Sequence, residues 1–201
     1  MGARKQFLEL APGELVVDRV VATCRAAAGW VGVVLPPGAA WSGSPIDALI
    51  EGGADRYASI AAGIAALPTG ADIVVIHSAS HPLASLDLVR RLVQAVDDGA
   101  DGAVPFQRTA DVIKRVAADG TLTTVGREGL GMAQAPTAWR RSILDKALAT
   151  VDEATEEGEA VEAIGGRVVA IDGELANLHI TDAGSLDLAR HLAARTRNPT
   201  P

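Results

Sequence analysis

The chain alternates short aliphatic runs with longer stretches of helical periodicity, and this alternation limits its fold more than any other feature. Residues 73–77 form the clearest short run, and residues 85–96 follow it as an amphipathic segment. Such alternation is typical of a parallel sheet covered by helices on both faces. Continuous aliphatic strands suit the interior of that sheet, because both of their faces are buried. The sequence therefore predicts an α/β fold.

The same pattern extends along most of the chain. The spacing predicts helices over residues 13–28, 55–67, 85–96, 139–149, 155–164 and 185–195, and strands over residues 30–35, 73–77, 102–106, 168–171 and 178–180. One segment differs, because residues 111–116 and 121–125 flank an Ala118-Asp119-Gly120 turn that is typical of a β-hairpin. Since this hairpin interrupts the strand–helix order, we expect it to project from the body of the fold.

Length and composition favour one domain over residues 1–201. Hydrophobic residues make up 48% of the 201 residues, which is enough for one sizeable core.

The net charge of -7 argues against a nucleic-acid partner, because nucleic-acid-binding proteins need a basic face. Cys24 is the only cysteine, so no intrachain disulfide can form. The apolar stretch over residues 20–35 is interrupted by Arg25 and is too short for a bilayer. We expect a cytoplasmic protein without a membrane partner.

Two loops carry the side chains best suited to chemistry. In an open α/β sheet, ligands bind at the carboxyl ends of the strands. The loop after residues 73–77 contains His77, Ser78 and His81, and a second loop contains His179. Each histidine, taken alone, fits a surface or hydrogen-bonded role as well as a ligand-binding role. A zinc site built from His81 and His179 lacks a visible third ligand. These residues alone indicate an enzyme-like α/β domain.

Several other motifs have simple structural interpretations. Gly52-Gly53 is typical of a turn, and Lys5 is typical of a solvated charge near a terminus. Glu156 and Glu157 suit the acidic first turn of a helix, where they complement the helix dipole. The sequence shows no Cys/His metal spacing, no nucleophile elbow and no complete glycine-rich phosphate loop.

Seven short segments nevertheless carry a pattern together. They begin at Lys5, Gly52, His77, Asp111, Ala133, Thr155 and Asn177. In that order they are similar to P-K-Q-F-L-x-L, G-G-x-x-R-x-x-S-V, H-D-A-A-R-P, D-T-I-K, x-Q-T-P-Q, T-D-D-x-x-x-V-E and N-I-K-I-T. Each motif is weak alone, but the seven occur in register over nearly the whole chain. Together they resemble the methylerythritol-phosphate cytidylyltransferase family.

The resemblance implies a fold, a reaction and an assembly. The fold is a Rossmann-like nucleotidyltransferase fold with a mostly parallel sheet, in which residues 111–127 form a dimerisation arm that reaches into a partner protomer. In the reaction, 2-C-methyl-D-erythritol 4-phosphate attacks the α-phosphorus of CTP and pyrophosphate leaves, a step of isoprenoid precursor synthesis. Catalysis in the family is electrostatic and uses Mg²⁺, which a carboxylate helps to hold. The implied partners are CTP, a sugar-alcohol phosphate and a second copy of the chain.

The resemblance also assigns roles to individual residues. The implied catalytic residues are Lys5 and His179. The implied nucleotide-binding residues are Gly2, Gly52, Gly53 and Ser59, and the implied substrate-binding residues are His81, Arg127 and Thr155.

The chain departs from the family at several of these positions. Ser78 replaces the metal-binding Asp, so we expect no metal ligand there, and His81 and His179 replace an Arg and a Lys. Their ordinary pKa of about 6.5 would leave them partly charged at pH 7. These changes favour an alternative, a catalytically impaired or inactive paralogue that keeps the dimeric fold and binds a phosphorylated ligand or a protein.

A further departure concerns the sheet. The family's first strand and its A-A-G-x-G-x-R loop have no counterpart ahead of Met1-Gly2. In the family's sheet order that strand is central. Its absence therefore predicts unpaired edges on the two neighbouring strands.

Overall fold

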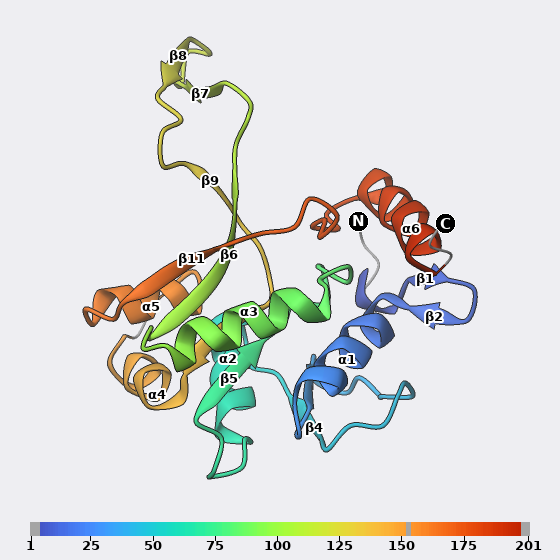
Figure 1. The fold of residues 1–201 in the computed structure, drawn as a ribbon. Coiled ribbons are helices and arrows are strands. Elements are labelled where there is room, and N and C mark those ends of the chain that lie inside the picture. The colour runs from blue at the N-terminus through green and yellow to red at the C-terminus, as the bar shows by residue number, and fades with distance from the viewer. Residues whose placement is uncertain (1–4, 152–153, 198–201) are drawn as a thin grey trace.

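The main sheet of the protein has strand order β11-β6-β10-β5. Its strands are β11 (Val168–Asp172), β6 (Gly102–Arg108), β10 (Thr137–Arg140) and β5 (Ile73–Ile76), and β9 (Gly131–Ala133) pairs with β6. The computed structural model describes residues 5–151 and 154–197 of the chain (Figure 1). Strand β11 is parallel to β6, whereas β10 is antiparallel to both β6 and β5. Strands β5, β6 and β11 consequently run in one direction, with β10 reversed between two of them.

A separate parallel pair lies beside this sheet. It consists of β3 (Gly32–Leu35) and β4 (Ala48–Glu51). Within the described ranges, no strand joins β3 to β5 by backbone pairing. Among the described residues, β3 and β5 therefore each have one edge without a strand partner, as the sequence predicted.

Helices cover the sheets and supply most of the core. They are α1 (Val16–Ala27), α2 (Arg56–Ala65), α3 (Leu86–Asp97), α4 (Arg141–Thr150), α5 (Glu157–Ala163) and α6 (Ala183–Arg197). Helix α3 packs across β6 and β10, and α4 contacts α5 and β10 (Figure 1). Asp55 caps α2 and Ser85 caps α3, each through its side chain, which satisfies amide groups that the helix leaves unpaired. None of these described helices is long and apolar enough to cross a membrane.

The amino-terminal elements pack against the last helix. They are the short 3-10 helix Lys5–Phe7, β1 (Glu9–Ala11) and β2 (Glu14–Leu15). Leu10 and Ile180 are fully buried in a shared cluster with residues of α6. This packing brings the Lys5 segment next to the loop that carries His179, although the two are far apart in sequence.

The predicted hairpin is confirmed. Strands β7 (Ile113–Val116) and β8 (Leu122–Val125) pair in register and project away from the body (Figure 1). Gly120 adopts a φ of +83° in the connecting turn, a conformation that side chains on L-residues disfavour. The hairpin, β9 and the distal part of β6 form the projecting arm.

Several predicted elements were wrong in type or extent. The helix expected over residues 139–149 begins at Arg141, because Trp139 belongs to β10 and is completely buried in the core. The helix expected over residues 13–28 begins at Val16, after two short strands. Strand β4 was not predicted at all. The strand expected over residues 178–180 is an extended loop, which donates one backbone bond from Ile180 to Ser80.

Candidate active site

A stacked pair of histidines marks the candidate site. The rings of His81 and His179 lie with centroids 4.6 Å apart and planes 18° from parallel. The loops that carry them are joined, because the Ile180 amide donates to the Ser80 carbonyl at 2.8 Å. The loop after β5 turns back on itself through a 3.0 Å bond from the His81 amide to the Ser78 carbonyl. Two residues separated by nearly a hundred positions are thereby held in contact.

Burial and nearby cations keep this pair uncharged. Burial lowers the pKa of His81 to about 4, with further contributions from His179 and Arg56. The pKa of His179 is also lowered, first by burial and then by the charge of Lys5. The structure thus corrects the expectation of ordinary histidine pKa values. At pH 7 both imidazoles of the free protein are neutral hydrogen-bonding groups, and His81 Nδ1 is buried without a partner in the described structure.

Two cations flank the pair. Lys5 donates from Nζ to the Ile180 carbonyl at 3.0 Å, which fixes its charge next to His179. Arg56 lies at the start of α2 and influences His81 electrostatically. The two catalytic residues implied by the resemblance, Lys5 and His179, are therefore brought together, and His81 joins them. This arrangement has the chemistry of an anion site.

A buried carboxylate holds Arg56 in place. Glu157 is 2% exposed and accepts from Arg56 Nη2 at 2.8 Å. It also accepts from Thr137 Oγ1 at 2.9 Å, and Thr137 in turn accepts from Trp139 Nε1. Glu157 does lie in the first turn of α5, as the sequence predicted, but it is buried and is also the partner of Arg56. The sequence did contain one indication that Glu157 has a role in the site, because this residue lies in the segment that is similar to T-D-D.

The glycine pair expected to bind nucleotide lies where a loop meets α2. A Cβ on Gly53 would come within 2.4 Å of Ala58, and one on Gly52 within 2.8 Å of Ser59 Oγ. Ser59 accepts from the Gly53 amide at 3.1 Å and donates to the Asp55 carbonyl. These glycines allow the loop to approach the helix closely, and Ser59 ties the two together.

Two other predicted site residues make their described hydrogen bonds elsewhere, and the structure does not describe a third. Arg127 lies in the arm, where it donates to the Ala110 carbonyl. Thr155 precedes α5, and its amide donates to Glu159. Gly2 lies outside the described residues.

The described side chains do not form a metal site. No group of three or more His, Cys, Asp and Glu side chains in residues 5–151 and 154–197 is suitably placed. Ser78 offers only a neutral hydroxyl at the position where the family pattern has a carboxylate, and Mg²⁺ prefers charged oxygen ligands. The His81–His179 pair likewise has no third protein ligand for zinc within the described structure.

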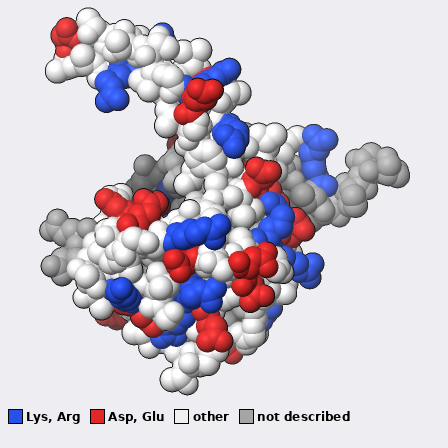
Figure 2. All heavy atoms as spheres, turned by 60° about the vertical axis from the view of Figure 1, so that its left-hand side comes forward, with Lys and Arg blue, Asp and Glu red and all other residues white. Residues whose placement is uncertain are grey.

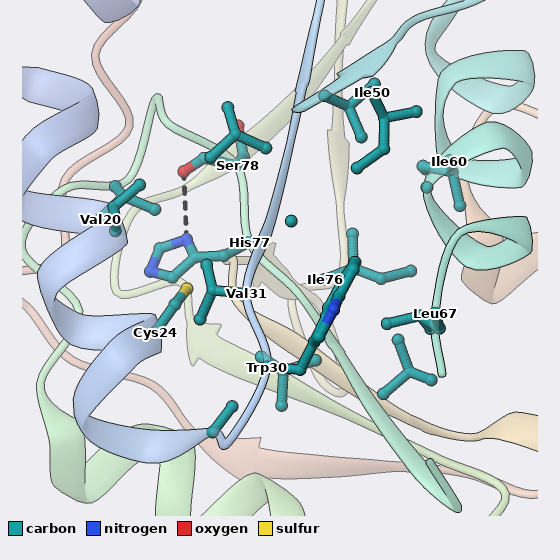
Figure 3. A pocket seen from close by; sticks show the side chains of 18 of the residues that line it. Val20, Cys24, Trp30, Val31, Ile50, Ile60, Leu67, Ile76, His77 and Ser78 are labelled. Atoms are coloured by element: carbon teal, nitrogen blue, oxygen red, sulfur yellow. Dashed lines mark hydrogen bonds between the residues drawn. The ribbon is translucent and has the colours of Figure 1, made fainter. Parts of the chain in front are cut away.

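A cavity of about 630 Å³ opens beside the histidine loop, between α1, β3, α2 and β5 (Figure 3). Val20 and Cys24 of α1 reach it from one side, and Ile60 and Leu67 from the other. Its lining is mostly aliphatic. Arg56 of the cation and histidine cluster and Ser59 also line it, so the cavity adjoins the anion cluster.

Charges on the surface are mixed in sign. Over the face shown in Figure 2, acidic and basic side chains alternate across the body, and both signs occur on the arm. That face therefore has no extended field of one sign.

Comparison with known proteins shows the family. The family model described as "IspD: 2-C-methyl-D-erythritol 4-phosphate cytidylyltransferase" matches residues 1–195. A protein of that name from Streptomyces avermitilis is 35% identical over 197 residues, which cover 89% of this chain and 79% of the relative. One from Chromobacterium violaceum is 34% identical and covers 94% of this chain and 89% of the relative. The chain spans only 39% of a bifunctional IspD/IspF enzyme from Caulobacter vibrioides.

Comparison of the fold with solved structures identifies the same family. The crystal structure of the Thermus thermophilus 2-C-methyl-D-erythritol 4-phosphate cytidylyltransferase superposes with a TM-score of 0.86 at 30% identity and covers 94% of this chain and 93% of that one. The bifunctional IspDF of Campylobacter jejuni, at 22% identity and a TM-score of 0.75, shares the fold over 49% of its length. The match over residues 1–195 and the shared fold show that this chain belongs to the 2-C-methyl-D-erythritol 4-phosphate cytidylyltransferase family.

Proposed function

We propose that this chain is a cytidylyltransferase that joins CTP and 2-C-methyl-D-erythritol 4-phosphate in isoprenoid precursor synthesis. A phosphate oxygen of the sugar alcohol would bond to the α-phosphorus of CTP, while the bond from that phosphorus to the β-phosphate bridging oxygen breaks. Pyrophosphate leaves with the electron pair. The observation that carries this proposal is the cluster of Lys5, His81, His179 and Arg56, in a chain that matches the family over residues 1–195.

The cluster supports charge stabilisation as its main contribution. Lys5 and Arg56 supply fixed positive charge, and such preorganised charges lower the energy of a phosphoryl-transfer transition state. Neutral His81 and His179 would donate hydrogen bonds to phosphate oxygens. We assign Gly52, Gly53 and Ser59 to the nucleotide, and Thr155 to the sugar-alcohol phosphate, by their family positions.

The family generally depends on a divalent metal, and we propose Mg²⁺ for this chain. The ion would be held by phosphate oxygens of CTP, which are hard, charged ligands. The residues around Ser78 do not fit a protein-held ion, because no carboxylate cluster accompanies the serine in the described structure. No catalytic step is therefore assigned to the metal.

We propose a cytoplasmic homodimer as the working form. The arm of each protomer would extend over its partner and place Arg127 near the partner's substrate. The projecting geometry of β7–β8 and its exposed apolar side chains support this assembly.

The second candidate is the impaired paralogue. It is favoured by the neutral state of His81 and His179 at positions where the family pattern has permanent cations. Loss of one preorganised charge contact typically costs about 2.7–4 kcal/mol of transition-state stabilisation. Turnover of the 201-residue chain should accordingly be very slow.

A pyrophosphate-release assay with CTP, Mg²⁺ and the sugar-alcohol phosphate distinguishes the active cytidylyltransferase from the impaired paralogue. We expect slow release that depends on the sugar-alcohol phosphate and that decreases further in Lys5→Ala. Lys146→Ala, which removes an exposed lysine of α4, is the matched control and should leave the rate unchanged. No release above background, with CTP still bound, would instead support the impaired paralogue.

A further inference from the structure

The loop that carries His179 is not held by a strand ladder. Residues 173–182 lie between β11 and α6 and belong to no helix or strand. A side chain that takes part in a reaction must be held within roughly 0.5 Å of its productive position, and loops are less precise supports than helices or strands. The position of His179 must therefore come from side-chain contacts and from isolated backbone bonds.

One glutamine side chain makes three hydrogen bonds to the start of this loop. Gln134 Nε2 donates to the carbonyls of Glu174 at 2.9 Å and of Asn177 at 3.1 Å. Gln134 Oε1 accepts from the Glu174 amide at 3.0 Å. The nitrogen of the side-chain amide therefore faces two acceptors and its oxygen faces a donor, so every group in this contact has a matching partner. The contact ends at Asn177, two residues before His179.

The loop comes close to this glutamine because Gly173 has no side chain. A Cβ on Gly173 would lie 2.5 Å from Gln134 Oε1, a separation at which a methyl group would displace the amide. Gly173 does not have a positive φ, so its backbone conformation is open to other residues. The glycine is therefore needed for the close approach of Gln134.

Gln134 is itself fixed to the main sheet. It follows β9 directly, and its backbone amide donates to the Pro105 carbonyl of β6 at 2.8 Å. A second bond runs beside it, because Asn177 is 1% exposed and donates from Nδ2 to the Ala135 carbonyl at 2.7 Å. These bonds tie the loop to the sheet at the base of the projecting arm.

The other side of His179 is fixed at the histidine site. The Ile180 amide donates to the Ser80 carbonyl at 2.8 Å, and the Ile180 carbonyl accepts from Lys5 Nζ at 3.0 Å. His179 thus lies between two attachments, one at Ile180 and one at Gln134. Both are needed to fix where the backbone of the loop lies and which way the ring points.

We propose that Gln134 is a positioning residue that holds His179 against His81 in the geometry that the substrates meet. Gln134 acts through the loop, since none of its described hydrogen bonds reaches His81, His179 or Lys5. The expected effect on turnover rests on the proposed function, whereas the effect on the ring geometry is measurable without substrate.

The experiment measures the contact between the two rings by NMR in the intact chain, labelled at its four histidines. A nuclear Overhauser effect connects the ring protons of His81 and His179 while the rings are stacked. It is compared in the parent chain, in Gln134→Ala and in Gln134→Glu, whose carboxylate still accepts a hydrogen bond but donates none to the two carbonyls. Gln94→Ala is the matched control, because Gln94 is an exposed glutamine of α3.

A further variant acts from the other side of the same contact. Gly173→Ala keeps Gln134 but places a methyl group where its amide lies. Thermal unfolding shows which variants fold, and the proposal is tested on those. The Glu174 carboxylate also accepts from the Ser85 amide at 3.0 Å, which holds the start of the loop when the Gln134 contact is lost.

We expect the ring contact to be lost in both Gln134 variants and in Gly173→Ala, and to be kept in Gln94→Ala. In the pyrophosphate-release assay, kcat of the same three variants should fall by at least about tenfold with a smaller change in KM, because misplacement of a group by about 1 Å can cost about a hundredfold in rate. Gln94→Ala should release pyrophosphate at the parent rate.

A ring contact that persists in folded Gln134→Ala and Gly173→Ala would overturn the proposal. Loss of the contact in Gln94→Ala would overturn it too, because any glutamine would then have the same effect. Loss of the contact with unchanged kcat would show that Gln134 holds the loop without serving the reaction. If the parent chain releases no pyrophosphate, the proposed function fails, and the ring contact alone decides whether Gln134 positions His179.

Discussion

His81 and His179 stack with ring centroids 4.6 Å apart, at two positions where the family pattern has an Arg and a Lys. Two charged imidazoles would repel one another at this separation, and burial disfavours charge further. The pair is therefore neutral in the free protein at pH 7. A bound phosphate would favour the charged forms and raise both pKa values.

The affinity of this site for CTP should rise as the pH falls. Because the free-state pKa of His81 is about 4, the increase should continue below pH 6.5 and level off only near pH 4. Calorimetric titration between pH 8 and pH 5 checks the continued increase below pH 6.5, after correction for phosphate protonation near pH 6. The double variant His81→Ala, His179→Ala should show a flatter profile. An identical corrected profile in the double variant would contradict a role for the pair.

Acid should also destabilise the fold through His77. Burial lowers the pKa of His77 to about 4, against the ordinary 6.5. Because the folded-state pKa is the lower one, this stability is fully present above pH 6.5 and is lost as the pH falls toward 4. The shift corresponds to about 3 kcal/mol. Urea unfolding of His77→Phe should depend less on pH over this range than unfolding of the parent chain.

The control for this measurement is His191→Gln, which changes an exposed histidine of α6. It should unfold with the same pH dependence as the parent chain. If His77→Phe did so too, burial of His77 would not be the cause of the acid sensitivity.

Much of the fold was predictable because local and tertiary preferences agree. The aliphatic run of β5 and the Ser85 cap of α3 identify their elements directly. The prediction failed at Trp139 because this residue ends the short strand β10, which pairs antiparallel with β5 and β6, and helix α4 follows directly. Strand β4 was missed because its apolar run, residues 48–50, is only three residues long and lies between Asp47 and Glu51.

The candidate site was predictable only in part. Motif resemblance identified Lys5, His81 and His179, and the structure places them together. The pKa values of the two histidines depend on their burial and on the contact between their rings. Neither can be read from the spacing of residues in the sequence. The ion pair between Arg56 and Glu157 spans 101 positions, and no local pattern predicts it.

Arg56→Ala should destabilise the protein more than Glu157→Gln. Removing the arginine leaves the buried Glu157 carboxylate with Thr137 as its remaining side-chain donor among the described contacts. An uncompensated buried charge is costly, but Arg56 is half-exposed, so we expect about 1–2 kcal/mol rather than the 3–5 kcal/mol of a fully buried pair. Glu157→Gln removes the buried charge, and the amide oxygen can still accept from Thr137 Oγ1. Urea unfolding of both variants and of the double variant measures the coupling, and equal losses would contradict this reasoning.

The exposed face of the arm should hold two protomers together. Val116 and Leu122 oppose each other across the β7–β8 pair and are 66% and 62% exposed, and Met132 of β9 is 61% exposed. A hairpin this short is marginal in water unless its apolar face packs on something. Val116→Asp should therefore convert the homodimer to a monomer at tens of micromolar in analytical sedimentation, because a carboxylate would be buried without a partner.

Thr123→Asp is the matched control, since Thr123 pairs with Arg115 and its side chain points to the opposite face of the same hairpin. It should leave the dimer intact. A parent chain that sediments as a monomer at this concentration, or a Val116→Asp variant that remains dimeric, would show that the arm does not hold the protomers together.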